Sequence, residues 1–113
     1  MDKNTNYSTV SVIVPTYKER DNLNELIERI ESVKDKYKYE LELLIMDDNS
    51  SDGSEELVIS MNKDWVNFHV RKSNRGLSLS VIDGLNRASK DVLIVMDADL
   101  SHPPEVIPAM INE

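Results

Sequence analysis

Acidic residues gather in three short segments of this sequence, and each segment directly follows a run of apolar residues. The segments span 15–19, 47–53 and 97–103, and between them they carry Glu19, Asp47, Asp48, Asp97 and Asp99. Bringing carboxylates together is unfavourable unless a cation neutralises them. Oxygen ligands of this kind favour Mg²⁺ or Mn²⁺. If the fold brings the three segments to one crevice, the sequence therefore predicts a divalent-metal site there.

The triplet Asp97-Ala98-Asp99 is the strongest candidate for chemistry. An isolated Asp-X-Asp is usually a capped turn, but this one stands directly behind a β-branched run and is matched by two other acidic strand ends. Both carboxylates can bind one metal, or one can bind the metal while the other contacts a ribose hydroxyl. Such a metal would bridge the two phosphates of a nucleoside diphosphate and stabilise it as a leaving group. His102 is either a third metal ligand or a hydrogen-bonding loop residue.

The other two acidic segments offer contacts for the nucleoside. Asp47, nearest to its strand, is the best candidate for a contact to the base or ribose, and at least one of residues 48–52 supplies a turn or a helix cap. Pro15 and Tyr17 can form a wall for the base, with Glu19 accepting hydrogen bonds; alternatively, Tyr17 is a partly buried loop aromatic. Arg75 either contacts a phosphate or the acidic crevice, or pairs with a surface carboxylate.

Short apolar runs separated by helical stripes must position these segments. The runs span 10–14, 41–46, 66–70 and 92–96, and each has the length and boundaries of a strand. A helical stripe follows at 23–33, behind a cap at Asp21 or Asn22, and Pro103-Pro104 opens a last helix. This alternation predicts an α/β fold with a mostly parallel sheet and helices on both faces. Ligands bind beyond the carboxyl ends of such strands, where the acidic segments fall.

Composition restricts the possible functions. The chain has 113 residues, a formal net charge of −8 and no cysteine. The negative charge argues against nucleic-acid binding and against a polybasic membrane-surface patch in this segment. The absence of cysteine excludes disulfides and thiolate chemistry. Apolar runs such as 92–96 are too short to cross a bilayer. Residues 1–9 are polar, and we expect a disordered lead-in there.

Four motifs in register resemble a known family. They are Val12-Ile-Val-Pro-Thr-Tyr-Lys-Glu19, Asp47-Asp-Asn-Ser-Ser-Asp-Gly53, Arg75-Gly-Leu77 and Met96-Asp-Ala-Asp-Leu-Ser-His-Pro-Pro-Glu105. Together they are similar to the inverting glycosyltransferases of GT-A fold, and within these to the dolichol-phosphate mannosyltransferase group. The resemblance covers residues 10–113 and implies the Rossmann-like N-terminal half of that fold, with the family's C-terminal part absent.

The resemblance also implies roles for individual residues. Asp97 and Asp99 would be the metal-binding and catalytic pair, with Asp99 the more direct ligand of Mg²⁺ or Mn²⁺. The residues implied for the nucleotide sugar are Pro15, Tyr17, Glu19, Ile45, Asp47, Asp97, Ala98 and Asp99. Two positions depart from the family pattern. Ser78 stands where a second glycine is usual, and Ser101 stands where glutamine is often found.

The implied activity is transfer of a sugar, mannose from GDP-mannose, to a polyprenyl (dolichyl) phosphate with inversion. This phosphate is already ionised near neutral pH, so the transfer needs no general base. The resemblance further implies a cytoplasmic location, at the cytoplasmic face of a membrane that the C-terminal part would contact. The exposed sheet edge left by that absent part could pair two copies as a homodimer.

Several alternatives stay open beside this prediction. A related transferase could use a UDP-sugar for polysaccharide or glycolipid synthesis, and a truncated chain could be an inactive nucleotide-binding fragment or a binding module. Nucleotidyltransferases need a glycine-rich basic loop after the first strand, and residues 15–21 contain no glycine. Phosphoacceptor receiver domains need paired aspartates after the first strand, whereas here they follow the second and fourth.

Overall fold

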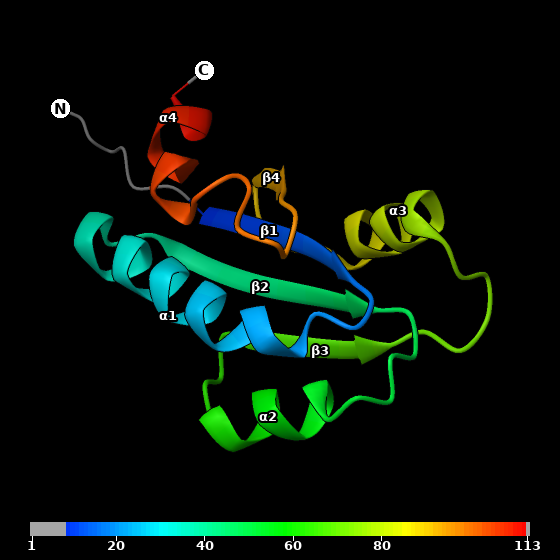
Figure 1. The fold of residues 1–113 in the computed structure, drawn as a ribbon. Coiled ribbons are helices and arrows are strands. Elements are labelled where there is room, and N and C mark those ends of the chain that lie inside the picture. Colours follow the sequence, from blue (N-terminus) through cyan, green and yellow to red (C-terminus); the bar gives the residue numbers. More distant parts are fainter. Residues whose placement is uncertain (1–8, 113) are drawn as a thin grey trace, which may run out of the picture.

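The structure is a computed structural model that describes residues 9–112 (Figure 1). Strands and helices alternate along these residues. In chain order they are β1 (Thr9–Thr16), α1 (Arg20–Tyr37), β2 (Glu40–Asp47), α2 (Ser54–Met61), β3 (Val66–Val70), α3 (Leu77–Arg87), β4 (Val92–Val95), the 3₁₀ turn η1 (Pro104–Val106) and α4 (Ile107–Ile111). The predicted lead-in falls mostly on residues 1–8, which lie outside the described residues.

The four strands form one parallel sheet in the order β3-β2-β1-β4. β1 and β2 lie in the middle and pair over their whole length, from Thr9 opposite Glu40 to Thr16 opposite Asp47. Parallel strands buried on both faces are expected to be mostly apolar, and between their end residues these two are apolar except at Ser11 and Glu42. The predicted α/β class with a parallel sheet is therefore confirmed, and the strands' carboxyl ends share one edge.

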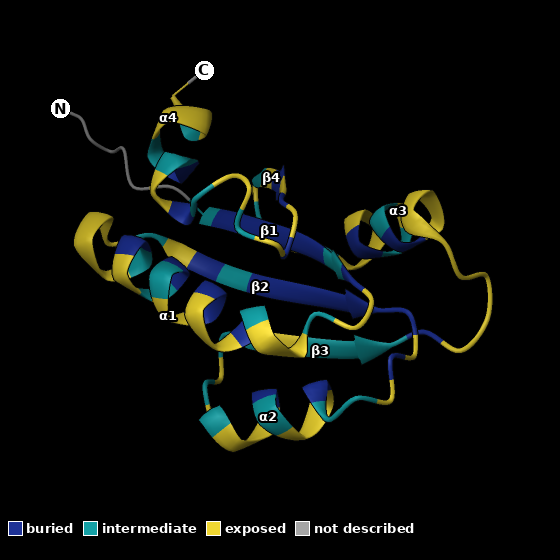
Figure 2. Cartoon of the chain, in the orientation of Figure 1, coloured by how far each residue is buried: buried dark blue, intermediate teal, exposed yellow. Residues whose placement is uncertain are grey.

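Most of the core lies between this sheet and α1. Leu23, Leu26, Ile27 and Ile30 form one fully buried stripe on α1, and they pack in one cluster with the inward residues of β1 and β2. Figure 2 shows the two central strands as the most continuously buried elements. Each such side chain contributes about 1.5–3 kcal/mol relative to exposure. This packing fixes the β1–α1 loop against the sheet edge.

The opposite face of the sheet is covered by α3, which packs on β1 and β2. The contact is close because Gly84 faces the sheet: a Cβ built on it would lie 2.5 Å from Ile13 Cγ2. β4 is not covered in the same way. Leu93 and Val95 point to the α3 side of the sheet, beside Ser11 and Ile13, yet they are 47% and 42% exposed.

Helix α1 begins earlier than the capping pattern indicates, so the expected cap at Asp21 or Asn22 is wrong. The helix starts at Arg20 after Glu19, which makes no side-chain cap. Lys18 adopts a left-handed conformation (φ 58°) that turns the chain into the helix at this point. The side-chain amide of Asn22 instead donates to Glu19 Oε1 at 2.9 Å.

None of the helices within residues 9–112 is both long and apolar enough to cross a membrane.

Candidate functional site

A cavity of about 350 Å³ lies at the carboxyl ends of β1 and β4. The β1–α1 loop, the end of β2, the start of α3 and the segment after β4 all contribute to its wall. The lining residues are Pro15, Thr16, Tyr17, Glu19, Asp48, Leu77, Ser80, Asp97, Ala98 and Asp99. Four of the five predicted carboxylates therefore share one cavity, as the parallel topology requires.

Six of the eight residues expected to bind a nucleotide sugar line this cavity, and two do not. Ile45 is fully buried in the core beneath α1, so its side chain is enclosed by other apolar groups. Asp47 lines a second cavity of about 440 Å³, bordered by the β2–α2 loop and β3. The expectation that all five carboxylates meet in one crevice is therefore wrong for Asp47.

Strand alternation explains where Asp47 lies. It shares the α1 side of the sheet with Ile45, and its register partner on β1 is Thr16. Thr16 Oγ1 donates to Asp47 Oδ1 at 2.7 Å. The amide of Ser50 donates to Oδ2 at 2.8 Å, and its hydroxyl to Oδ1 at 2.6 Å. Asp47 thus closes the β2–α2 turn, and a contact from it to a base or ribose stays a prediction.

The predicted metal-binding triplet is presented at the cavity mouth. Asp97 and Asp99 are exposed, whereas Ala98 between them is buried in the core cluster. Asp99 Oδ1 accepts a hydrogen bond from the Ser101 amide at 3.0 Å. Hydrogen bonding from Ser101 is the main reason that the pKa of Asp99 is lowered. Both carboxylates are thus held at the cavity by a buried alanine, with Asp99 favoured in its ionised form.

Two aspartates do not make a closed metal site by themselves. Within residues 9–112, no group of three or more histidine, cysteine or acidic side chains is arranged to hold a metal ion, so His102 completes no such group. A hard divalent cation takes six or more oxygen ligands. The donor set therefore fits a cation that arrives with further oxygens, such as those of a diphosphate.

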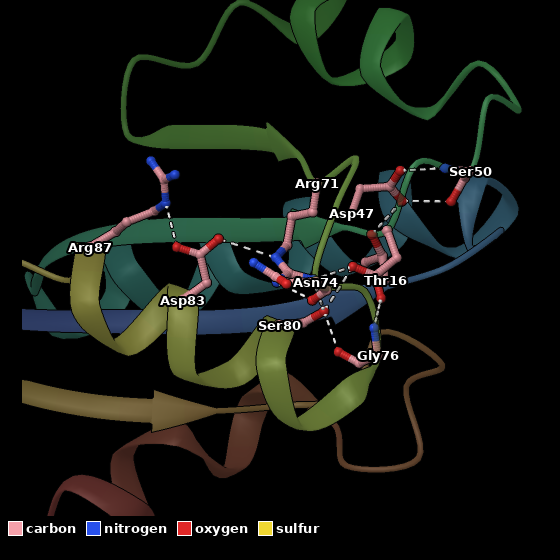
Figure 3. Close-up of polar contacts among 10 residues, drawn as sticks. Thr16, Asp47, Ser50, Arg71, Asn74, Gly76, Ser80, Asp83 and Arg87 are labelled. Atoms are coloured by element: carbon pink, nitrogen blue, oxygen red, sulfur yellow. Dashed lines mark hydrogen bonds and ion pairs between the residues drawn. The ribbon is translucent and has the colours of Figure 1, made fainter.

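Asp48 is neutralised by an arginine that the sequence did not point to. Arg71 Nη1 lies 2.5 Å from Asp48 Oδ1, and both residues are buried. The Gly76 amide donates to Asp48 Oδ2 at 2.7 Å, and Ser80 Oγ lies 2.9 Å from Oδ1 (Figure 3). Burial alone would raise the pKa of Asp48, but these hydrogen bonds and the Arg71 charge together lower it. Nothing in the order of residue types distinguishes Arg71 from the neighbouring surface cations.

Tyr17 forms an exposed part of the wall, and two cationic side chains lie over its ring. Its side chain is 51% exposed. Arg75 Cζ lies 5.3 Å from the ring centroid, and Lys18 Nζ lies 5.4 Å from it. Both distances are in the range of cation–π contacts. Arg75 therefore stands at the rim of the cavity beside an aromatic side chain.

Comparison with known proteins agrees with this arrangement. The family model described as glycosyl transferase family 2 matches residues 11–113. The chain belongs to this family.

Individual relatives narrow the comparison. The chain is 47% identical over 104 residues to a dolichol-phosphate mannosyltransferase of Pyrococcus furiosus, covering 91% of this chain and 29% of that protein. It is 35% identical over 106 residues to an undecaprenyl-phosphate 4-deoxy-4-formamido-L-arabinose transferase of Salmonella choleraesuis, covering 90% and 32%.

Among solved structures, a mannosyltransferase of Pyrobaculum calidifontis in complex with GDP-Man and Mn²⁺ superposes with a TM-score of 0.73. It is 27% identical, and the match covers 84% of this chain and 28% of that one. The GT-A-type fold predicted from the motifs is confirmed. The chain spans about a third of the length of the relatives it matches.

Proposed function

We propose that this chain is the nucleotide-sugar-binding part of a glycosyltransferase that moves mannose from GDP-mannose to a polyprenyl phosphate with inversion. The observation that carries the proposal is the exposed pair Asp97 and Asp99 at a cavity whose wall also holds Tyr17 and Glu19. An aromatic face, an acceptor for base or ribose groups and a carboxylate pair are the contacts that a nucleoside diphosphate sugar needs.

In this proposal each part of the cavity wall has its own role in binding. Pro15, Tyr17 and Glu19 hold the nucleoside. Asp97 and Asp99 would hold Mg²⁺ or Mn²⁺, which when bound stabilises negative charge on the departing diphosphate. Ala98 anchors this segment at the cavity by burying its methyl group in the core. Asp47 acts from the second cavity or through the turn that it closes, and Ile45 supports it from the core.

The acceptor class follows from what the relatives share. The Pyrococcus and Salmonella relatives are named for different sugars, yet both names contain a polyprenyl phosphate. A phosphate monoester is ionised near neutral pH, so it attacks the anomeric carbon without a general base. We therefore propose that catalysis rests on positioning and on stabilising the leaving group. Because such lipids are membrane-bound, we propose that the reaction takes place at a membrane surface, on its cytoplasmic side.

A UDP-sugar donor is the second candidate. The Salmonella relative is 35% identical and is named for a sugar other than mannose, so this level of similarity does not fix the donor.

Calorimetric titration of GDP, and then of UDP, with and without Mn²⁺, tests the proposal. We expect GDP to bind only with the metal, and the variant Asp99→Asn to weaken binding by about tenfold or more, or about 1.4 kcal/mol. Asp35→Asn is the matched control, because Asp35 is an exposed aspartate on α1. Tighter binding of UDP than of GDP would favour the second candidate, a UDP-sugar donor. Binding of neither nucleotide, or binding that Asp99→Asn leaves unchanged, would contradict the proposed site.

A further inference from the structure

The segment 96–104 carries Asp97 and Asp99, the carboxylate pair, and it is anchored on α1 as well as on the sheet. It begins at Met96, whose amide donates to a carbonyl of β1 at 3.0 Å. It ends at Pro104, which is buried, and Ile107 beyond it is fully buried in the core cluster. The turn η1, which starts at Pro104, packs on α1. The segment therefore leads from the sheet edge to the side of this helix.

One ion pair joins η1 to α1 in a defined orientation. Arg29 Nη2 donates to Glu105 Oε1 at 2.6 Å, and Arg29 Nε donates to Glu105 Oε2 at 3.1 Å. Two parallel hydrogen bonds between a guanidinium and a carboxylate fix direction as well as distance. The hydrogen bond from Arg29 is also the main reason that the pKa of Glu105 is lowered. The pair therefore holds η1 in one orientation on the helix.

The backbone between the carboxylate pair and η1 needs such support. Leu100 is left-handed (φ 64°), although it is not a glycine. A backbone conformation of this kind persists only where its surroundings hold it. On one side, the Ser101 amide donates to Asp99 Oδ1 at 3.0 Å. On the other side, the apolar contacts of Pro104 set the depth of η1 but have no preferred direction. The contact between Arg29 and Glu105 supplies that direction.

The same helix sets the opposite wall of the cavity. α1 begins at Arg20, directly after the loop that carries Tyr17 and Glu19. The backbone amide of Asn22 donates to the Glu19 carbonyl at 2.9 Å, and its side-chain amide donates to Glu19 Oε1 at 2.9 Å. Arg29 lies about 13 Å further along the helix axis, at about 1.5 Å per residue. One rigid element therefore holds the nucleoside wall at its start and the segment 96–104 near its middle.

We propose that Arg29 and Glu105 are a positioning pair that sets, through α1, the distance between the carboxylate pair and the wall formed by Tyr17 and Glu19. The inference rests on the proposed function of the cavity. A cation on the diphosphate must meet both carboxylates while the nucleoside stays on the wall, so this distance has to be fixed. Neither Arg29 nor Glu105 lines the cavity, and the pair therefore acts only through the segment that it holds.

Glu25 offers a matched control within the same contact. Arg29 Nη1 donates to Glu25 Oε2 at 3.1 Å, but Glu25 lies on α1 itself, one turn before Arg29. Glu105→Gln removes the carboxylate that joins two elements, whereas Glu25→Gln removes one that joins α1 only to itself. Both glutamates are exposed, so both variants should fold and each loses one negative charge.

A backbone readout follows from the sequence around the carboxylate pair. An aspartate followed by alanine occurs once, at Asp97-Ala98, and an aspartate followed by leucine occurs once, at Asp99-Leu100. Labelling aspartate carbonyl carbon together with alanine and leucine nitrogen therefore selects the amides of Ala98 and Leu100 in an NMR spectrum. We expect Glu105→Gln to move both signals, because the segment loses its orientation on α1. Glu25→Gln should leave them in place.

Nucleotide binding is measured on the same samples by calorimetry with GDP and Mn²⁺. We expect Glu105→Gln to weaken binding about threefold and Glu25→Gln to change it by less than about 1.5-fold. Urea unfolding recorded in parallel separates a loss of affinity from a loss of stability. A pair that only stabilises the fold leaves the affinity of the folded protein unchanged in Glu105→Gln, and that result overturns the inference.

Exchange of the two charges separates the ion pair from the loss of a side chain. Arg29→Glu alone brings like charges together beside Glu25 and Glu105, and it should weaken binding more than Glu105→Gln does. Arg29→Glu combined with Glu105→Arg restores opposite charges across the same contact. We expect the affinity of this double variant to return to within about twofold of that of the unaltered chain. A double variant that binds as weakly as Arg29→Glu alone contradicts the positioning pair.

Failure of the proposed function is distinguished by the unaltered chain. If that chain binds neither GDP nor UDP, the proposed function is wrong, and the pair is then judged on the spectra alone. Signals of Ala98 and Leu100 that Glu105→Gln leaves in place overturn the positioning pair in that case too.

Discussion

Asp47 and Asp48 are adjacent in the sequence, yet they do different things. Asp47 points to the α1 side of the sheet and closes the β2–α2 turn. Asp48 lies on the α3 side, where Arg71 and Gly76 bind it. A shift of one residue along an extended chain reverses the direction of the side chain. The two aspartates therefore cannot be exchanged, although they look alike in a motif.

The lowered pKa of Asp48 predicts a specific acid sensitivity. A carboxyl whose folded pKa lies below its unfolded value of about 3.9 stabilises the fold above that value. The contribution is lost as the pH falls through the folded pKa. Arg71 and Asp83 are the charged groups around it, and Arg71 stays protonated throughout.

The measurement is the free energy of urea unfolding from about pH 7 to about pH 3, for the unaltered chain and for Asp48→Asn. We expect the unaltered chain to be the more stable at neutral pH, and the difference to shrink below about pH 4. Asp35→Asn, on the exposed side of α1, is the control for the loss of one surface carboxylate. A difference that is constant with pH would contradict the role of the ionised carboxylate.

At the scale of elements, the packing of α3 against the sheet depends on Gly84, a residue without a side chain. Gly84 Cα faces Ile13 and Met46, and a Cβ there would lie 2.5 Å and 3.1 Å from their side chains. A helix-interior glycine replaced by alanine ordinarily gains up to about 1 kcal/mol. We expect Gly84→Ala to lose about 1–3 kcal/mol instead, because the helix must move away from β1.

Thermal or urea unfolding checks this expectation, with Ser78→Ala as the control on the exposed side of the same helix. The control should change stability by less than about 0.5 kcal/mol. A more stable Gly84→Ala variant would show that α3 can shift freely over the sheet.

The elements were largely predictable from the sequence, and their contacts were not. Apolar runs such as 10–14 and the stripe at 23–33 are long and regular, so their periods identify strands and a helix. The parallel order then brings Glu19, Asp48, Asp97 and Asp99 to one cavity. The opposite directions of Asp47 and Asp48 follow from strand alternation, which the motif alone does not reveal. The partner of Asp48 depends on the conformation of one loop, for which composition and spacing carry no signal.

At the scale of the whole molecule, β4 and α3 leave apolar surface exposed. β4 is an edge strand, and Leu93 and Val95 stand uncovered beside α3. Edge strands with apolar side chains tend to pair with another chain. A homodimer through this surface stays a prediction.

We expect the 113-residue chain to self-associate at high concentration and Leu93→Lys to reduce this association about tenfold. Analytical ultracentrifugation over a concentration series measures it. Ile59→Lys is the matched control, because Ile59 is 67% exposed on α2, away from β4. Equal reduction by both variants would point to unspecific hydrophobic contact.

The charge of the cavity wall has a consequence for the order of events. Glu19, Asp97 and Asp99 face the cavity, and within residues 9–112 its lining contains no lysine or arginine. Lys18 and Arg75 lie over the Tyr17 ring, and the three carboxylates still outnumber these two cations. A free diphosphate approaching this wall is repelled, so its association should speed up as added salt shortens the range of the repulsion. A diphosphate that already carries a divalent cation has less negative charge and should associate faster. Added salt should then speed its association less, or slow it. We therefore expect the proposed nucleotide site to select the metal-loaded nucleotide by the rate of encounter, before any contact to the base is made.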